Sequence, residues 1–102
     1  MSLPVVLSYE AKIDFDPAAD WYQDQAGLGW AGLGARFTDA VRKALDGAGQ
    51  MPELHAVLQR GIRRAKVQKF PYCVDHRVQA DRVVVIAVLH NRRDPSVWKS
   101  RA

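Results

Sequence analysis

With 102 residues, the chain is long enough for one domain that buries roughly 60 to 65% of its unfolded surface, and too short for two domains of ordinary size. A single cysteine excludes an internal disulfide, and no apolar run approaches the ~18 residues that cross a membrane. No signal sequence follows Met1, so we expect a soluble, cytoplasmic protein that makes no membrane contact.

The net charge of +4 conceals an asymmetry between the two halves of the chain. Residues 1–59 carry four Lys or Arg and eight Asp or Glu, whereas residues 60–102 carry eleven Lys or Arg and three Asp. A field of that sign in the second half attracts polyanions, either nucleic acid or an acidic polypeptide. A solvated face that only maintains solubility is the alternative.

The N-terminal segment fits two secondary-structure patterns. Residues 3–7 are apolar and predict a first strand, and apolar side chains then alternate as far as Phe15, which favours a longer strand. A helix fits the same stretch, because Ser8 is placed to cap it and Pro17 either kinks a helix begun at Tyr9 or starts a later one. Both patterns make residues 18–26 helical.

Residues 27–34, GLGWAGLG, contain four glycines and predict a hinge between two helices. A phosphate-binding loop is disfavoured, because no strand precedes the glycines and no Lys-Ser or Lys-Thr follows them. An amphipathic helix comes next and ends at Gly47 or Gly49. The two helices should form an antiparallel hairpin that buries its apolar stripe on the sheet.

Residues 50–61 predict a loop in which apolar side chains pack back under the hairpin: Leu54, Val57 and Leu58. His55 in this loop is expected to be solvent-exposed. The three histidines and Cys73 lack the spacing of metal ligands, so we expect no metal and no cofactor.

Three strands are predicted in the basic half. Along residues 64–68, Ala65 and Val67 would face one way and three polar side chains the other. Residues 72–78 alternate as in a half-buried strand, with Cys73 as an ordinary half-buried residue. Residues 83–89 are apolar on both faces and β-branched at five of seven positions, which predicts the centre of the sheet.

The cations of these strands permit two interpretations. A row of them on one strand face suits a surface that follows phosphates. The alternative is that they pair with Asp75 or Asp81, or with the acids of the helices. A second set of polar side chains follows the predicted central strand: His90, Asn91, Arg92, Arg93 and Asp94. We expect a charged partner to contact the protein at this end of the strand.

Two histidines lie on these strands. His76 shares its strand face with apolar residues, so we expect it in the core or a groove. His90 is expected on one face with Val84, Ile86 and Val88. It is either a group that titrates near neutral pH or a half-buried residue bonded to a neighbouring arginine or carbonyl.

Taken in order, these segments resemble the RelE/ParE-type toxins of bacterial type II toxin–antitoxin systems, often described as plasmid stabilisation proteins. The resemblance runs from Val5 to Arg101 and rests on order and spacing, not on one motif. It is carried by Glu10-Ala11, Asp14, Ala18, Trp21-Tyr22, Gly32-Leu33-Gly34, Phe37, Pro52, Ile62-Arg63-Arg64-Ala65, Lys69-Phe70-Pro71-Tyr72, Asp81-Arg82-Val83-Val84-Val85, His90-Asn91-Arg92-Arg93-Asp94-Pro95 and Trp98.

The resemblance implies an α+β fold in which a helical hairpin packs on a small, mostly antiparallel sheet in the order β-α-α-β-β-β. One such domain would span residues 1–102. The resemblance also implies that residues 9–15 are helical.

Members of the family act in two ways. RelE-like members cleave mRNA, usually on the ribosome, by turning the ribose 2′-hydroxyl onto the neighbouring phosphate, whereas ParE-like members poison DNA gyrase. For a nuclease, the candidate catalytic residues are His90, Arg64, Lys66, Arg92 and Arg93. RNA-cleaving relatives often carry Tyr or His in the tail where this chain has Trp98, whose indole cannot usefully exchange a proton. The ParE-like, non-enzymatic branch is therefore favoured.

The implied partners are a cognate antitoxin, whose acidic segment would order on the basic surface, and DNA gyrase as target. For a nuclease, the ribosome and mRNA replace gyrase, and a homodimer is left open. The residues expected to bind antitoxin or target are Arg63, Arg64, Lys66, Lys69, Arg92, Arg93 and Trp98. A non-toxic basic binding or assembly domain is the third hypothesis.

Overall fold

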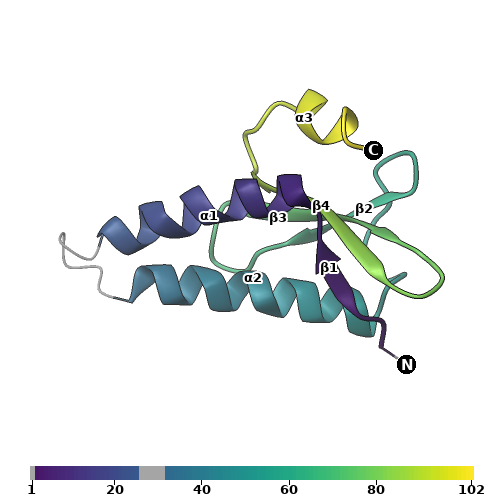
Figure 1. Cartoon of the computed structure of the whole chain (residues 1–102), viewed down its shortest axis with the longest axis horizontal. Coiled ribbons are helices and arrows are strands. Elements are labelled where there is room, and N and C mark those ends of the chain that lie inside the picture. Colours follow the sequence, from purple (N-terminus) through teal and green to yellow (C-terminus); the bar gives the residue numbers. More distant parts are fainter. Residues whose placement is uncertain (1, 26–31) are drawn as a thin grey trace.

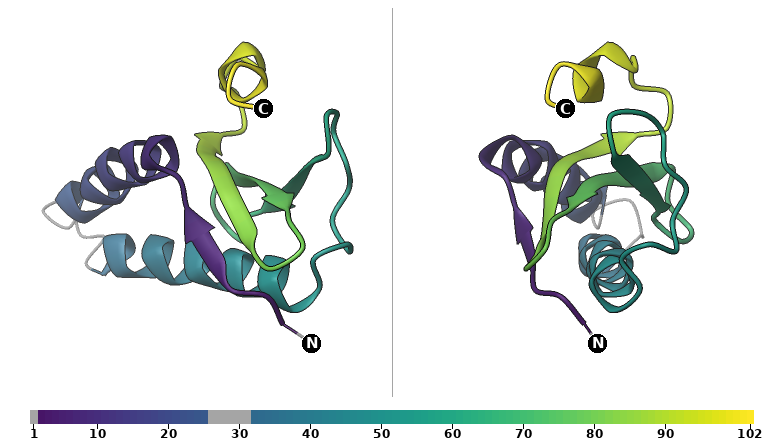
Figure 2. Two further views of the ribbon diagram at one scale, coloured as in Figure 1. Left: turned by 45° about the vertical axis from the view of Figure 1, so that its right-hand side comes forward. Right: turned by 90° about the vertical axis from the view of Figure 1, so that its right-hand side faces the viewer.

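A computed structural model describes residues 2–25 and 32–102 of the chain. The elements are β1 (Val5–Leu7), α1 (Tyr9–Asp24), α2 (Leu33–Gln50), β2 (Ile62–Lys66), β3 (Tyr72–Val78), β4 (Val83–His90) and α3 (Ser96–Lys99). The hairpin of α1 and α2 covers one face of the sheet, and α3 lies on the other (Figures 1 and 2). The predicted α+β fold and its element order are confirmed.

The four strands lie in the order β1-β4-β3-β2. β1 pairs with β4 in parallel, and the other two pairs are antiparallel. β4 is a central strand as predicted, because side chains on both of its faces are buried. No helix among the described residues is long and apolar enough to cross a membrane.

A β-bulge interrupts the pairing of β3 with β4. Asp75 lies opposite Ala87 and His76 opposite Val85, so Ile86 is the extra residue. Val85 and Val88 consequently face the helices, whereas Ile86 packs towards α3. The expectation that Val84, Ile86, Val88 and His90 share one face was wrong, because a bulge shifts the two-residue period of a strand by one.

The helical interpretation of residues 9–15 is confirmed. The Ser8 side chain accepts a hydrogen bond from the Ala11 N–H at 3.1 Å, and the Ser8 N–H bonds to the Val85 carbonyl at 2.9 Å. Ser8 is therefore the single residue between β1 and α1, bonded through its backbone to the sheet and through its side chain to the helix. Pro17 lies within the helix at an exposed position.

Replacing Ser8 with alanine should lower the free energy of unfolding by about 1 kcal/mol, because an N–H of the first turn loses its acceptor. Urea denaturation of the two proteins measures the difference. Ser8→Asp is the matched control, since its carboxylate can accept the same bond and also suits the positive end of the helix. Equal losses in both variants would show that the cap contributes nothing.

α2 begins at Leu33, after Gly32 with a φ of +81°. Residues 27–31 of the predicted hinge, with Trp30, lie outside the described residues, and the rest of the motif enters α2. A Cβ on Gly34 would lie 3.0 Å from the Gln23 Cβ, so this glycine lets the two helices approach closely. The predicted end of the helix was right to within a few residues.

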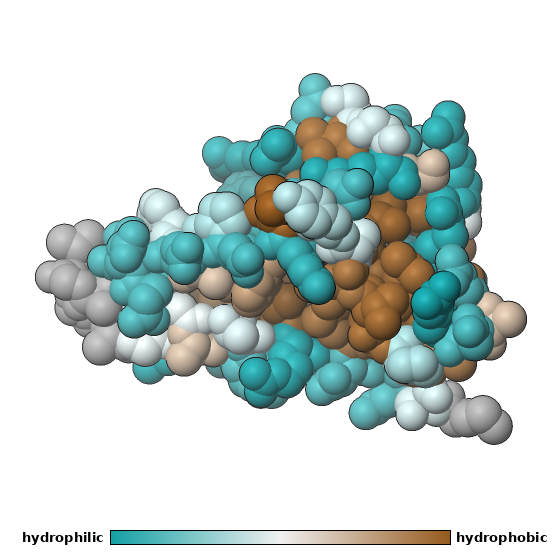
Figure 3. All heavy atoms as spheres, viewed as in Figure 1, coloured by the Kyte–Doolittle hydropathy of each residue, from teal (hydrophilic) through white to brown (hydrophobic). Residues whose placement is uncertain are grey.

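Two apolar clusters hold the layers together. The larger lies between the hairpin and the sheet, and five aromatic rings pack in it: Phe15, Tyr22, Phe37, Phe70 and Tyr72. The smaller lies under α3 and includes Ile62, Leu89 and Trp98. Figure 3 shows apolar atoms between the two helices and over β1, with hydrophilic side chains at the rim.

The loop of residues 51–61 lies along the outer edge of β2. The Arg64 N–H donates to the Ala56 carbonyl at 3.1 Å, and the Leu58 N–H donates to the Ile62 carbonyl at 2.7 Å. Leu54 and Val57 are exposed in consequence. The prediction that this loop packs under the hairpin was wrong, because its backbone pairs with a strand edge instead.

Candidate interaction surfaces

Arg64 is engaged within its own chain. Its Nε and Nη2 atoms donate to the two carboxylate oxygens of Asp75 at 2.7 and 3.0 Å, and Asp75 is completely buried. The guanidinium carbon lies 5.9 Å from the centre of the Trp98 ring, which is itself buried. A planar fork held on both sides in this way is not free to wrap a phosphate.

Arg63 points to the opposite face of β2 and is engaged as well. Its Nη1 atom donates to the carbonyls of Glu53 and His55 at 3.1 and 2.8 Å. This guanidinium therefore fastens the loop of residues 51–61 to the sheet. Of the residues predicted to bind a partner, Arg63, Arg64 and Trp98 are thus built into the fold.

The remaining predicted cations are exposed: Lys66, Lys69, Arg92 and Arg93. None of them forms an ion pair with a carboxylate of the described residues. Their charges are therefore available to a partner. Lys66 and Lys69 belong to β2 and the turn after it, and the two arginines follow β4.

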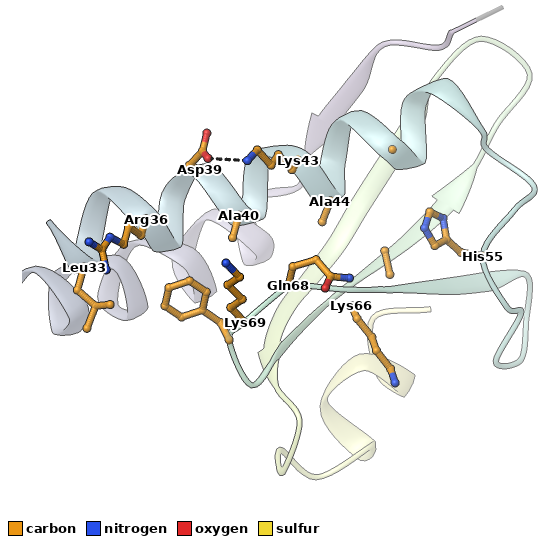
Figure 4. Close-up of a pocket in the computed structure, with 13 residues that line it drawn as sticks. Leu33, Arg36, Asp39, Ala40, Lys43, Ala44, His55, Lys66, Gln68 and Lys69 are labelled. Atoms are coloured by element: carbon orange, nitrogen blue, oxygen red, sulfur yellow. Dashed lines mark ion pairs between the residues drawn. The ribbon is translucent and has the colours of Figure 1, made fainter.

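A groove of about 560 Å³ runs between α2 and β2 (Figure 4). Arg36, Lys43 and Lys69 supply its cations, and Lys66 borders it with its ammonium directed to the other face of the sheet. Among the described residues, Asp39 is the carboxylate of its lining and pairs with Lys43 at 3.2 Å. Apolar side chains such as Leu33 and Phe70 line the remainder. We call this the α2/β2 groove. In Figure 4, Lys69 reaches towards α2 and Lys66 extends away from it.

Sequence reasoning missed the part that α2 plays in this groove. Arg36 and Lys43 belong to residues 1–59, whose net charge is negative. Counting the charges of each half of the chain therefore did not reveal these two cations. Their spacing with Ala40 and Ala44 on one side of a helix was the signal that could have found them. The groove is therefore basic on both walls.

A second groove, of about 430 Å³, lies between α1 and the end of β4. Ile13, Pro17 and Trp21 form its α1 wall and are exposed, and His90 and Arg93 form the other. We call this the α1/β4 groove. It combines an apolar wall with a basic one.

His90 is exposed, not half-buried as one interpretation expected. Its ring centre lies 5.4 Å from that of Tyr72, and its Nδ1 accepts the Arg92 N–H at 3.1 Å. That hydrogen bond requires Nδ1 to be unprotonated. His90 is the last residue of β4 and pairs with Tyr72, and this position at the end of the strand explains its exposure.

The candidate nuclease residues do not form one cluster. Arg64 lies over Trp98 on the face that α3 covers, and alternation places Lys66 on the same face. His90 packs on Tyr72 at the face of the hairpin, with β3 between it and β2. The structure brings His90 together with Arg93 and separates it from Arg64 and Lys66.

Asp14 and Arg101 complete the open edge of β4. β1 ends at Leu7, and beyond it Asp14 accepts the Val88 N–H at 3.1 Å. Arg101 donates to Asp14 at 2.6 and 3.2 Å and to the Ile86 carbonyl at 3.2 Å. This ion pair satisfies backbone groups that a strand would otherwise pair, and it ties the tail to α1.

His76 is completely buried, as predicted. Burial chiefly lowers its pKa from the ordinary 6.5, because a charged imidazole is poorly solvated there. The ring centre of His55 lies 5.6 Å away, at nearly a right angle. His55 is partly buried, so its predicted exposure was wrong; Arg63 draws its backbone towards the sheet.

Three comparisons with known proteins bear on this arrangement. The family model described as "ParE toxin of type II toxin-antitoxin system, parDE" matches residues 5–95. The chain belongs to the ParE toxin family. The predicted resemblance to RelE/ParE-type toxins, with the ParE branch favoured, is therefore confirmed.

A solved structure described as "Chromosomal ParDE TA system from P. aeruginosa" is similar in fold, with a TM-score of 0.70. The alignment covers 87% of this chain and 96% of that chain at 14% sequence identity. A likeness at that identity supports the ParE fold alone. None of the curated proteins matches this chain. Among the described residues, no group of three potential metal ligands occurs.

Proposed function

We propose that this ParE-family protein is a toxin that acts by binding, inhibits DNA gyrase in the cytoplasm, and is neutralised by a cognate antitoxin. The observation that supports this most directly is the distribution of its cations. Lys66, Lys69, Arg92 and Arg93 are exposed and have no carboxylate partner among the described residues. Lys69 lines the α2/β2 groove and Arg93 lines the α1/β4 groove.

An acidic polypeptide suits the α2/β2 groove. Its apolar lining can bury side chains, and both of its walls carry cations, so an acidic segment would find hydrophobic and electrostatic partners together. Long-range attraction would also accelerate association and make its rate fall with added salt. An antitoxin segment that orders on binding has this chemistry.

The mRNA endonuclease remains the second candidate, because His90 and Arg93 share the α1/β4 groove. Cleavage through the 2′-hydroxyl needs a second proton-transfer group. Asp14, a carboxylate that lines this groove, is held by Arg101 and the Val88 N–H, and burial raises the pKa of Tyr72. That environment favours binding over acid–base catalysis. A non-toxic assembly domain would show neither activity.

Purified protein should inhibit gyrase supercoiling of relaxed plasmid or trap cleaved DNA, and induced expression should arrest bacterial growth. Gel analysis of the plasmid, with transcript mapping in the same cells, separates the candidates. Normal supercoiling together with shortened transcripts would identify a nuclease. Normal growth at high expression would support the assembly domain.

The double variant Arg36→Glu/Lys69→Glu should bind the protein encoded by the neighbouring reading frame about tenfold or more weakly, because two attractive charges of the groove become repulsive. Surface plasmon resonance at several salt concentrations would show the loss mainly in the association rate. Lys12→Glu/Arg42→Glu is the matched control, with the same charge change on exposed helix positions outside the groove. Equal loss in both pairs would indicate a general charge effect and contradict a groove.

A further inference from the structure

His55 and His76 form a pair whose polar atoms are incompletely bonded. The Nδ1 of His55 and the Nε2 of His76 are buried and have no hydrogen-bond partner among the described residues. Within that part of the chain, the polar contact of the His76 ring is its Nδ1 at 3.4 Å from the Val74 carbonyl. Buried polar atoms of this kind are rare in folded proteins and call for an explanation.

Positive groups surround the pair. Arg63 of β2 and His55 itself disfavour a charge on His76, and Lys43 of α2 lines the same groove as His55. Asp75 favours the charge, but it is on the opposite face of β3 and bound by Arg64. No carboxylate of the described residues forms an ion pair with either imidazole. The Val74 carbonyl and Asp75 favour a proton on His76, but burial outweighs both and the net effect is a lowered pKa.

The loop that carries His55 covers the outer edge of β2. The Ala56 carbonyl of the loop accepts the Arg64 N–H, and the Leu58 N–H donates to the Ile62 carbonyl. The Arg63 side chain donates to two further carbonyls of the loop. The loop has little apolar anchorage, since Leu54, Val57 and Leu58 are all exposed. Arg60 of the loop also donates to the Lys99 carbonyl at 3.4 Å. The attachment of the loop therefore depends on these polar contacts and on the packing of His55 against His76.

We propose that the loop of residues 51–61 is an acid-released cover: protonation of His76, against which His55 packs, drives the loop away from β2 and opens one wall of the α2/β2 groove. Release would free the Arg64 N–H and the Ile62 carbonyl at the sheet edge. If the loop controls partner binding, that role rests on the proposed function. Opening of the loop itself depends only on contacts within this chain.

The sign follows from burial. His76 is neutral while the loop is closed, and an opened loop returns it towards its ordinary pKa of 6.5. Each pH unit below that value favours opening up to about tenfold, because the open state binds the additional proton. Between pH 7.5 and 5.5 we therefore expect protection of the loop-paired amides to fall by up to about tenfold.

Native-state hydrogen exchange tests this directly. The amides to follow are those of Arg64 and Leu58, after correction for the intrinsic pH dependence of exchange. The Val83 amide, bonded to Pro4 at the other edge of the sheet, is the internal reference and should keep its protection. An equal loss of exchange protection at the Val83 amide would mean global unfolding and would overturn the proposal. Unchanged protection at Arg64 and Leu58 would overturn it as well.

Variants separate the pair from other histidines. His76→Gln should remove or reduce the pH dependence of exchange protection at the Arg64 and Leu58 amides. If the buried position does not tolerate glutamine, His55→Gln serves in its place. His90→Gln, at an exposed position in the other groove, should leave it unchanged. A full pH response in both variants of the pair would refute the proposal. Gyrase inhibition at pH 7.5 is a separate readout, so failure of the proposed function would leave this result intact.

Discussion

Phe37→Ala should lower the free energy of unfolding by about 4 kcal/mol, the largest effect we expect from one substitution. Phe37 is completely buried, and its ring lies 4.8 to 5.8 Å from those of Tyr22, Phe70, Tyr72 and Phe15. These rings come from both helices and from the sheet. Truncation would remove apolar burial and leave a cavity where the layers meet.

Guanidinium denaturation monitored by circular dichroism measures this loss. Trp21→Ala is the matched control, because Trp21 is also aromatic but 56% exposed and contacts the cluster only through the edge of Tyr22. It should change stability by no more than about 1 kcal/mol. A Phe37→Ala variant as stable as Trp21→Ala would show that the aromatic cluster is not the main tie between hairpin and sheet.

Asp75→Ala should lower the free energy of unfolding by about 3 kcal/mol. The Arg64 guanidinium, which donates two hydrogen bonds to Asp75, would lose its carboxylate partner. The estimate lies at the lower end for a buried pair, since the Arg64 side chain is 32% exposed and can recruit water. Loss of the carboxylate also frees the guanidinium that lies over Trp98.

A double-mutant cycle separates the pair from the packing around it. Arg64→Met leaves a buried carboxylate unpaired and should cost as much as Asp75→Ala, whereas the two changes together should cost less than their sum. Asp39→Ala breaks an exposed pair with Lys43 and should cost less than about 1 kcal/mol. Additive losses in the cycle would contradict a coupled ion pair.

The order of elements followed from local patterns in the sequence. The apolar, β-branched run from Val83 predicted a central strand, since such a strand is buried on both faces. Helical spacing and a glycine-rich break predicted the hairpin. Local pattern left residues 9–15 open between strand and helix, and the family resemblance favoured the helix that Ser8 caps. Each of these features depends on residues close together in the chain, so the sequence carries its signal.

Only the tertiary structure decided which side chains are available to a partner. Arg64 and Lys66 are equivalent in the sequence pattern, yet Arg64 lies directly opposite Asp75 across β2 and β3 and Lys66 lies opposite Cys73. The bulge at Ile86 separates His90 from the face predicted for it, and the path of the loop places His55 on His76.

Local periodicity and composition thus determined the layers and the basic character of the C-terminal half. Strand register, a one-residue bulge and the course of a loop determined which cations are paired and which line the two grooves. These features depend on the positions of residues from different strands and loops relative to one another. No short stretch of sequence records those positions, because each is set by packing across the whole sheet.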